Sequence, residues 1–144
     1  MSTILSRAAL AALHAHLAAA YPGEGCGVLV GLDQGGARRI ERAIGCANLA
    51  PETPARRYLI APGELLAADH AARAEGLEVL GFFHSHPDHP AVPSAFDLER
   101  AWPYYSYLIV SLARGIPDAH GLWRLRADGA AFEPEPLTID GEAG

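Results

Sequence analysis

The sequence has no lysine, few cysteines and no long apolar run, and each scarcity excludes a class of protein. All eleven basic residues are scattered arginines and the formal net charge is −6, so nothing resembles the basic tract that follows a phosphate backbone. We therefore expect no nucleic-acid partner. Cys26 and Cys46 are too few for a disulfide framework and lack the paired spacing of a zinc ribbon, so two thiols are expected, with one bridge as the alternative.

The absence of long apolar segments bears on location. No stretch approaches the roughly 18 consecutive apolar residues of a membrane span, so we expect a cytoplasmic protein without a membrane segment. Residues 7–20 imitate a signal peptide, but His14 and His16 interrupt them. Apolar side chains also recur there at helical spacing along one face, at Leu10, Leu13, Leu17 and Tyr21. We interpret residues 5–20 as an amphipathic helix of the mature protein.

Length and element order predict the fold class. A chain of 144 residues, half of them apolar, has the size of one domain, which we place at residues 1–140 with a flexible tail at 141–144. Strand and helix patterns alternate, with hairpins at both ends, which favours a single-domain α/β protein with a mixed β-sheet flanked by helices. Helices are predicted at 5–20, 62–76 and 94–102, and strands at 26–31, 37–44, 56–62, 77–86, 104–112 and, as a hairpin turning at Asp128–Gly129, across 121–139.

The segment "HSHPDHPAVPSAFD", residues 84–97, carries the strongest chemical signal. His84 and His86 end a predicted strand, where side chains two residues apart share one face and have Cα atoms roughly 6.6 Å apart. The proline-rich loop is long enough to return the Asp97 carboxylate to these imidazoles. Two imidazoles and one carboxylate are a typical set of three zinc ligands that leaves a fourth position for water, so this open set indicates hydrolysis.

The same segment also has a purely structural interpretation. "SAFD" is a capping box, in which Ser94 as N-cap and Asp97 three residues later satisfy each other's backbone donors. A histidine at the end of a strand is usually a half-buried polar residue. The capping role and the metal role can coexist.

The segment resembles the signature of the JAMM metalloproteases, the catalytic MPN family, which is a distant glutamate followed by H-[ST]-H-x7-S-x-x-D. Residues 22–31, "PGEGCGVLVG", resemble the context of that glutamate and place Glu24 at the acidic position. The strand at 104–112 is also similar, so the likeness covers residues 5–137. It implies an MPN fold, which is similar to that of cytidine deaminases.

The resemblance also implies a role for each matching residue. His84, His86 and Asp97 correspond to the ligands of one Zn²⁺ per chain. Glu24 corresponds to the general base that takes a proton from water, and Ser94 to the hydroxyl that holds the substrate carbonyl. The implied activity is that of a zinc-dependent peptidase or isopeptidase. Its implied substrate is a ubiquitin-like or sulfur-carrier protein, cut after the C-terminal Gly-Gly.

Two other functions, those of a non-catalytic scaffold and of a deaminase, fit the sequence less well. A non-catalytic MPN scaffold or interaction module is the main alternative, but such modules lose ligands, whereas this chain retains every motif position. A zinc nucleoside deaminase requires H-x-E together with P-C-x-x-C, and the sequence contains no C-x-x-C.

The remaining candidates receive structural interpretations. Asp88 and His89 lie in the loop between His86 and Asp97, which we call the metal loop, but outside the motif positions, so we expect them to be solvated. We expect Cys26 to pack in a buried strand. Four histidines without partner spacing are expected at the surface: His14, His16, His70 and His120. Three aromatic residues that follow the short helix are expected in the core, with a substrate groove as the alternative: Trp102, Tyr104 and Tyr105.

Overall fold

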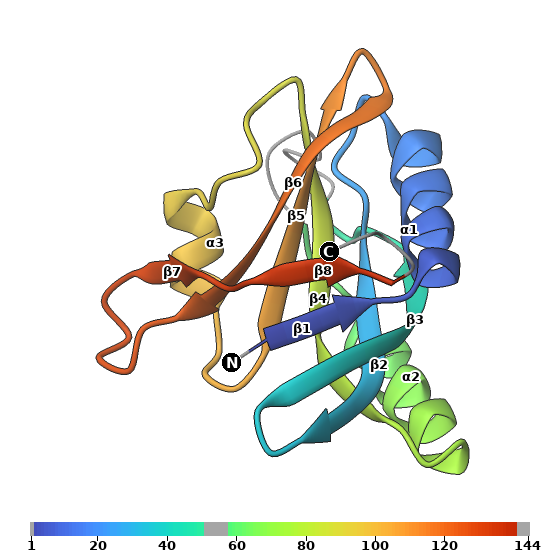
Figure 1. Cartoon of the computed structure of the whole chain (residues 1–144). Helices are drawn as coiled ribbons and strands as arrows, with labels where there is room; N and C mark the ends of the chain where they lie inside the picture. The colour runs from blue at the N-terminus through green and yellow to red at the C-terminus, as the bar shows by residue number, and fades with distance from the viewer. Residues whose placement is uncertain (1, 51–57, 141–144) are drawn as a thin grey trace.

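The computed structural model of the chain describes residues 2–50 and 58–140, which build one eight-stranded mixed sheet in the order β7-β6-β5-β4-β2-β3-β1-β8 (Figure 1). The predicted tail at 141–144 lies outside the described residues. The strands are β1 Ser2–Leu5, β2 Cys26–Gln34, β3 Ala37–Cys46, β4 Glu78–Pro87, β5 Ser106–Ala113, β6 Ile116–Leu125, β7 Phe132–Pro134 and β8 Leu137–Ile139.

Three helices accompany the sheet: α1 Arg7–Ala20, α2 Pro62–Ala74 and α3 Ala95–Arg100. The helix predicted at 5–20 is confirmed, and it begins where the Ser6 hydroxyl accepts a hydrogen bond from the Ala9 amide. α2 begins with Pro62 and is followed by Gly76 at a φ of +76°, the left-handed conformation that commonly ends a helix. None of the described helices is long and apolar enough to cross a membrane.

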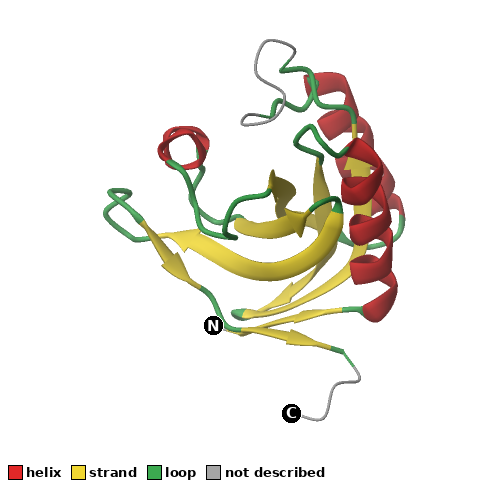
Figure 2. Ribbon diagram, turned by 90° about the horizontal axis from the view of Figure 1, so that it is seen from above, coloured by secondary structure: helices red, strands yellow, loops and turns green. Residues whose placement is uncertain are grey.

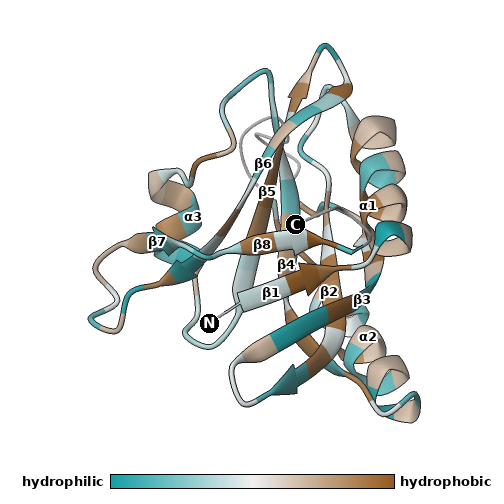
Figure 3. Ribbon diagram, in the orientation of Figure 1, coloured by the Kyte–Doolittle hydropathy of each residue, from teal (hydrophilic) through white to brown (hydrophobic). Residues whose placement is uncertain are grey.

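The sheet has an apolar core on each face, because the strands at its centre are buried on both sides. Figure 2 shows the curvature of the sheet and the two long helices beside it, and Figure 3 shows the apolar course of β5. α1 covers one core, with Leu5, Ala9, Leu13, Leu17, Leu29, Ile40, Leu80, Phe83, Leu108, Val110, Leu112, Leu122 and Ile139. α2 covers the other, with Val28, Val30, Cys46, Ala68, Ala72 and Val79.

The connection between β4 and β5 determines where the metal loop lies. These two strands are parallel neighbours, with Phe83 opposite Leu108, whereas β2 pairs antiparallel with both β3 and β4. A parallel pair needs a crossover, so the chain must leave the end of β4 and return to the start of β5. α3 lies in this crossover, which brings its first turn back towards the last residues of β4.

The structure corrects parts of the predicted element list. Residues 58–61 form no strand, and residues 56–57 of the strand predicted there lie outside the described residues. Leu59 is bound to residues 48–49 instead: its amide donates to Asn48 Oδ1 at 3.0 Å, and its carbonyl accepts from the Leu49 amide at 2.8 Å. The sequence interpretation missed β1, and it placed residues 137–139 in the hairpin, whereas they form a separate strand, β8, that is a parallel neighbour of β1. The hairpin at Asp128–Gly129 and the mixed sheet are confirmed.

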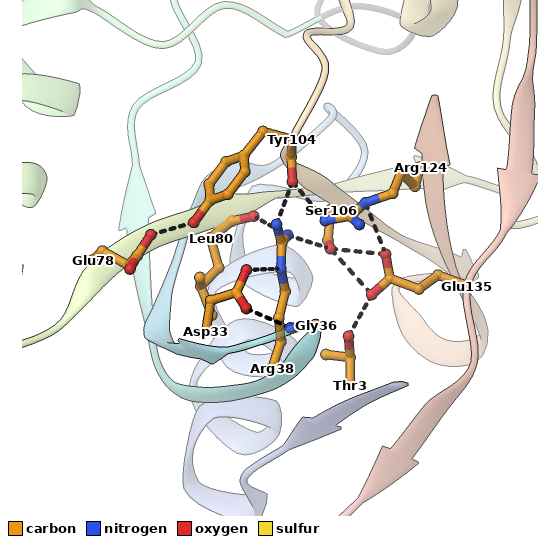
Figure 4. Close-up of polar contacts among 10 residues, drawn as sticks. All are labelled: Thr3, Asp33, Gly36, Arg38, Glu78, Leu80, Tyr104, Ser106, Arg124 and Glu135. Atoms are coloured by element: carbon orange, nitrogen blue, oxygen red, sulfur yellow. Dashed lines mark hydrogen bonds and ion pairs between the residues drawn. The ribbon is translucent and has the colours of Figure 1, made fainter. Parts of the chain in front are cut away.

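A cluster of polar side chains is buried at the end of the sheet where β4 begins (Figure 4). The Arg38 guanidinium, 3% exposed, lies at its centre and donates from Nε to Asp33, from Nη1 to the Leu80 carbonyl and Ser106 Oγ, and from Nη2 to the Tyr104 carbonyl. Ser106 in turn donates to Glu135, which also accepts from the Thr3 hydroxyl. We call this the Arg38 cluster: Thr3, Asp33, Arg38, Tyr104, Ser106, Arg124 and Glu135.

Candidate metal centre

Three elements bring the predicted site residues together at the other end of β4. His84 and His86 leave the last part of that strand on one face, and the pairing of Cys26 with His84 sets the start of β2 beside them. Glu24 lies two residues before β2, and Asp97 lies in the first turn of α3. Glu24, His84, His86 and Asp97 each offer one nitrogen or oxygen atom, and these atoms all lie within 4.8 Å of one another.

The closest contacts join the two imidazoles and the carboxylate. His84 Nε2 lies 3.1 Å from Asp97 Oδ1, His86 Nε2 lies 3.2 Å from Asp97 Oδ2, and the two Nε2 atoms are 3.2 Å apart. All three side chains are buried. Two nitrogens and a carboxylate therefore converge on one small volume.

Neighbouring groups fix the orientation of these side chains. His86 Nδ1 lies 2.9 Å from the Pro90 carbonyl, which can only accept, so Nδ1 carries a proton. Nε2 faces Asp97, to which it donates when the ring is protonated and presents a lone pair when the ring is neutral. The Ser94 amide donates to Asp97 Oδ2 at 2.8 Å, and the Asp97 amide donates to Ser94 Oγ at 3.1 Å. The predicted capping box is confirmed, and it aims the Asp97 carboxylate at the histidines.

Two buried atoms at this site have no hydrogen-bond partner, Glu24 Oε1 and His84 Nδ1. Leaving buried polar atoms unpaired costs stability, and when His86 is neutral the lone pair on its Nε2 faces the Asp97 carboxylate, which is repulsive without a proton or a cation between them. A cation among the four side chains would remove that repulsion. Imidazole and carboxylate donors are those that zinc takes in open sites, so the residues present fit this metal.

Burial and mutual contacts shift the pKa values of the four groups. Burial raises the pKa of Glu24 to about 8, with a further upward contribution from Asp97. For Asp97, hydrogen bonds from His84 and His86 outweigh burial and hold its pKa well below the usual range. Burial lowers the pKa of His84; it also opposes protonation of His86, but contacts with Asp97 and the Pro90 carbonyl leave that pKa raised. The site thus pairs one firmly ionised carboxylate with one that readily holds a proton.

A hollow of about 270 Å³ opens beside the cluster. Its lining includes Glu24, His86 and Ser94, so three of the motif side chains face the same space. The remaining lining is mostly apolar and comes from the metal loop: Pro87, His89, Pro90, Val92 and Pro93.

Three supporting residues were not identified from the sequence. Ser85 lies between the two histidines, and its Oγ accepts from the Gly25 amide at 2.8 Å, while its own amide donates to the Gly25 carbonyl at 3.0 Å. The Asn48 side chain donates to the Glu24 carbonyl at 2.9 Å. The Tyr58 ring stacks on His84 with centroids 4.5 Å apart. Of these three, only Ser85 could have been identified from the sequence, because it occupies the hydroxyl position of the H-[ST]-H motif.

Several structural interpretations of single residues were wrong. His16 is half-buried, with Nε2 3.1 Å from the Cys46 carbonyl. Trp102 and Tyr104 are exposed rather than in the core. Asp88 is exposed as predicted, although its carboxylate also accepts hydrogen bonds from the Tyr21 hydroxyl and the Arg114 amide.

The other interpretations are confirmed in the main. Tyr105 packs against the α2 core, and His70, His89 and His120 are exposed, whereas His14 is half-buried. Both cysteines are free and buried, and burial raises the pKa of Cys26 to about 12, which suits packing rather than nucleophilic chemistry.

Comparison with known proteins places these features in a family. The family model described as prokaryotic homologs of the JAB domain matches residues 6–126. A desampylase of Haloferax volcanii is 44% identical over 91 residues, 62% of this chain and 63% of the relative. A probable TtuB-protein conjugate cleaving protease of Thermus thermophilus is 39% identical over 103 residues, 72% of this chain and 66% of the relative. The matches thus span slightly under two thirds of each relative.

Solved structures extend the likeness to the whole fold. The solution structure of a protein from Desulfitobacterium hafniense superposes with a TM-score of 0.84 at 35% identity, covering 99% of this chain and 94% of that protein. The eight-stranded sheet and its helices are therefore shared with a solved relative over almost their full extent.

Proposed function

Because the chain belongs to the prokaryotic homologs of the JAB domain, we propose that it is a zinc-dependent peptidase or isopeptidase acting on a ubiquitin-like or sulfur-carrier protein. We place the cut after the C-terminal Gly-Gly of that substrate. The observation that carries the proposal is the convergence of four nitrogen and oxygen atoms of the kind that bind metals, beside an open hollow. Two of the four side chains, Glu24 and His84, also have a buried atom without a hydrogen bond. The names of the Haloferax and Thermus relatives, a desampylase and a conjugate cleaving protease, support this substrate class.

In this proposal His84, His86 and Asp97 hold one zinc ion per chain. Zinc bound by three such ligands supplies Lewis acidity, which lowers the pKa of bound water to about 7 and polarises a carbonyl oxygen. The protein's contribution is to fix the ligands before the metal arrives. The Pro90 carbonyl sets the His86 tautomer, and the Ser94 amide holds one carboxylate oxygen of Asp97.

Glu24 acts as the general base and then as the general acid. Its carboxyl group lies within 4.8 Å of the ligand atoms but lines the hollow, so it can reach a water molecule there. Burial raises the pKa of this carboxyl to about 8, within reach of the range in which one group can accept a proton from water and later transfer it to the leaving amine.

Ser94 stabilises the substrate oxygen as negative charge develops. Its Oγ already accepts the Asp97 amide proton, which leaves the hydroxyl proton to be donated towards the hollow that Ser94 lines. A donor positioned before the reaction strengthens as the carbonyl becomes tetrahedral. The same hydroxyl therefore caps α3 and faces the substrate.

The substrate is expected to be an extended, glycine-rich tail. Glu24, His84 and His86 lie at strand ends, Asp97 lies in the first turn of α3, and three prolines line the hollow beside them. Glycine residues of a substrate can approach the ligands there, because they have no side chain that would collide with the lining. Main-chain hydrogen bonds to the tail, in the manner of β-augmentation, would provide affinity, while the folded part of the substrate binds at a distance from the scissile bond.

The test incubates the protein with two sulfur-carrier-type proteins, one extended by a single residue beyond Gly-Gly and one joined to lysine through an isopeptide bond. Each reaction is run with and without a chelator. We expect chelator-sensitive cleavage directly after the second glycine, and close to one zinc per chain by elemental analysis. His86→Ala should lose zinc and activity, whereas His70→Ala, which changes an exposed histidine on α2, should retain both.

Each failure has a distinct meaning. Cleavage of an arbitrary unstructured peptide, with neither conjugate cut, would retain the hydrolase and refute the substrate class. Zinc binding without cleavage of any substrate would favour the scaffold alternative. Absence of zinc after purification without chelators would refute the metal assignment.

A further inference from the structure

Tyr21, Asp88 and Arg114 meet at the edge of the candidate site, although they belong to three separate segments. The Tyr21 hydroxyl donates to Asp88 Oδ2 at 2.6 Å, and the Arg114 amide donates to Asp88 Oδ1 at 2.9 Å. Tyr21 caps the C-terminus of α1, Asp88 follows β4, and Arg114 lies in the turn between β5 and β6. One carboxylate thus ties all three segments together.

Asp88 is the fixed part of this contact. It lies two residues after His86, and its amide donates to the Leu112 carbonyl of β5 at 2.7 Å, which continues the pairing of the two parallel strands. Its φ of +56° is in the left-handed region, which asparagine and aspartate tolerate better than most residues. The side chain therefore projects from backbone that the sheet holds in place.

Tyr21 connects this fixed point to Glu24. It lies three residues before Glu24, and its ring lies so close to Gly115 that a Cβ there would be 3.3 Å from Tyr21 Cδ1. On the C-terminal side of Glu24, the chain is held by the two Gly25–Ser85 hydrogen bonds. The Glu24 carbonyl itself accepts a hydrogen bond from the Asn48 side chain. Among these contacts, the Tyr21 hydroxyl is the one that anchors the segment before the carboxylate.

We infer that Tyr21 and Asp88 are positioning residues that hold Glu24 at the distance its proton transfer requires. The inference rests on the proposed hydrolysis. Neither side chain is among the predicted metal ligands, and neither is the base itself. Loosening the segment 21–24 should displace the Glu24 carboxylate while leaving the metal ligands on β4 and α3 in place. Proton transfer depends steeply on such placement, whereas His84, His86 and Asp97 all lie outside this segment.

The test compares Tyr21→Phe with wild type and with a matched control, Tyr104→Phe. Both substitutions remove only a hydroxyl that donates to a carboxylate, but the Tyr104 contact with Glu78 lies at the opposite end of β4. We expect Tyr21→Phe to lower kcat about five- to tenfold, with KM within twofold and zinc content unchanged, by the usual size of one hydrogen bond. Tyr104→Phe should keep the kcat of the wild type.

A second variant tests whether the effect passes through Asp88. Asp88→Gly accommodates the left-handed φ but removes the acceptor, so it should reproduce the loss of kcat. The double variant should then be no slower than Asp88→Gly alone, because both substitutions break the same contact. Multiplied losses in the double variant, an unchanged kcat in Tyr21→Phe, or a rise in KM in place of a fall in kcat would overturn the inference.

Hydrogen exchange separates this inference from the proposed function, because it requires no substrate. In Tyr21→Phe, the amides of residues 23–25 should exchange roughly fivefold faster than in wild type, with exchange in β4 unchanged. If wild type cleaves no conjugate but this change is seen, the hydrolase proposal fails and the positioning contact stands. Unchanged exchange at 23–25 would overturn the positioning role, whatever the activity.

Discussion

The two ends of β4 carry buried polar clusters that use their hydrogen-bonding groups in opposite ways. In the Arg38 cluster, every nitrogen of the Arg38 guanidinium has an acceptor, and the acceptors come from four different segments. At the candidate metal centre, Glu24 Oε1 and His84 Nδ1 are buried without a partner. The Arg38 guanidinium is thus fully paired within the described protein, whereas each of these two side chains at the metal centre has a buried atom without a hydrogen bond.

This difference separates stability from function. A buried charge that is fully paired contributes to holding segments together, and its loss leaves its partners unsatisfied. Buried groups that remain unpaired lower stability, so a fold retains them where chemistry uses them. Breaking the Arg38 cluster should therefore affect folding, and changing the metal centre should affect turnover.

The largest effect is expected from Arg38→Met, which keeps much of the side-chain volume but removes all the donors. Asp33, Ser106 and the Tyr104 carbonyl would each lose one hydrogen bond from a buried charge, so the free energy of unfolding should fall by about 3 kcal/mol. Urea unfolding measures this change, and zinc content and activity of the folded protein should stay constant.

Arg126→Met is the matched control for this variant. Arg126 pairs with Asp128 in a contact whose two side chains are each 54% exposed, so its loss should cost no more than about 0.5 kcal/mol. Equal stability of the two variants would mean that the Arg38 cluster contributes no more than a surface ion pair.

Glu24→Gln should have the next largest effect, and on turnover alone. The amide keeps the shape of the side chain but cannot accept a proton from water, so kcat should fall on the order of a hundredfold. Zinc content should match wild type, because the three ligands are untouched. Loss of zinc in this variant would make Glu24 a ligand rather than a base.

Ser94→Ala should affect both folding stability and turnover, because Ser94 both caps α3 and lines the hollow. Removing the cap should lower the free energy of unfolding by about 1 kcal/mol, with zinc retained. Turnover should also fall. Unchanged turnover with lower stability would assign Ser94 to the structural side of the comparison alone.

The smallest effect concerns acid stability and the Arg38 cluster. A hydrogen bond from the Gly36 amide and the contact with Arg38 lower the pKa of Asp33 below its unfolded value. Its contribution is therefore present above about pH 4 and is lost as the pH falls through the folded pKa. The Tm difference between wild type and Asp33→Asn should be largest at neutral pH and shrink below pH 4. A difference that grows in acid would contradict this assignment.

The sequence predicted the metal centre better than the Arg38 cluster for a physical reason. His84 and His86 are two residues apart on one strand, so their side chains share one face, and Asp97 returns to them through a short loop. Their spacing in the sequence is therefore enough to predict that the three side chains meet. Glu24, some sixty residues earlier, was found only through the family resemblance, and membership of that family is confirmed. The roles assigned to the five motif residues remain predictions.

The residues of the Arg38 cluster have no such local signal. Thr3 and Glu135 are 132 positions apart, and Arg38 is 68 positions from Ser106, so only the completed sheet brings them together. β1 was missed because it contains few residues, and the short β8 was not separated from the predicted hairpin for the same reason. The strand predicted at 56–62 failed over 58–61 for a different reason: its residues suit a strand, but the Leu59 amide donates to the Asn48 side chain instead of to a neighbouring strand.

The position of β1 between β3 and β8 has a consequence for the order of folding. Thr3 pairs with Arg38 on one side and with Leu137 on the other, so one of its ladders closes a loop of about 130 residues. During synthesis, β1 can join β3 early, but its second edge stays open until residues 137–139 have left the ribosome. Until then it offers an unpaired strand edge to other chains. We expect a chain truncated before Leu137 to associate with itself through the uncovered edge of β1, which β8 otherwise pairs.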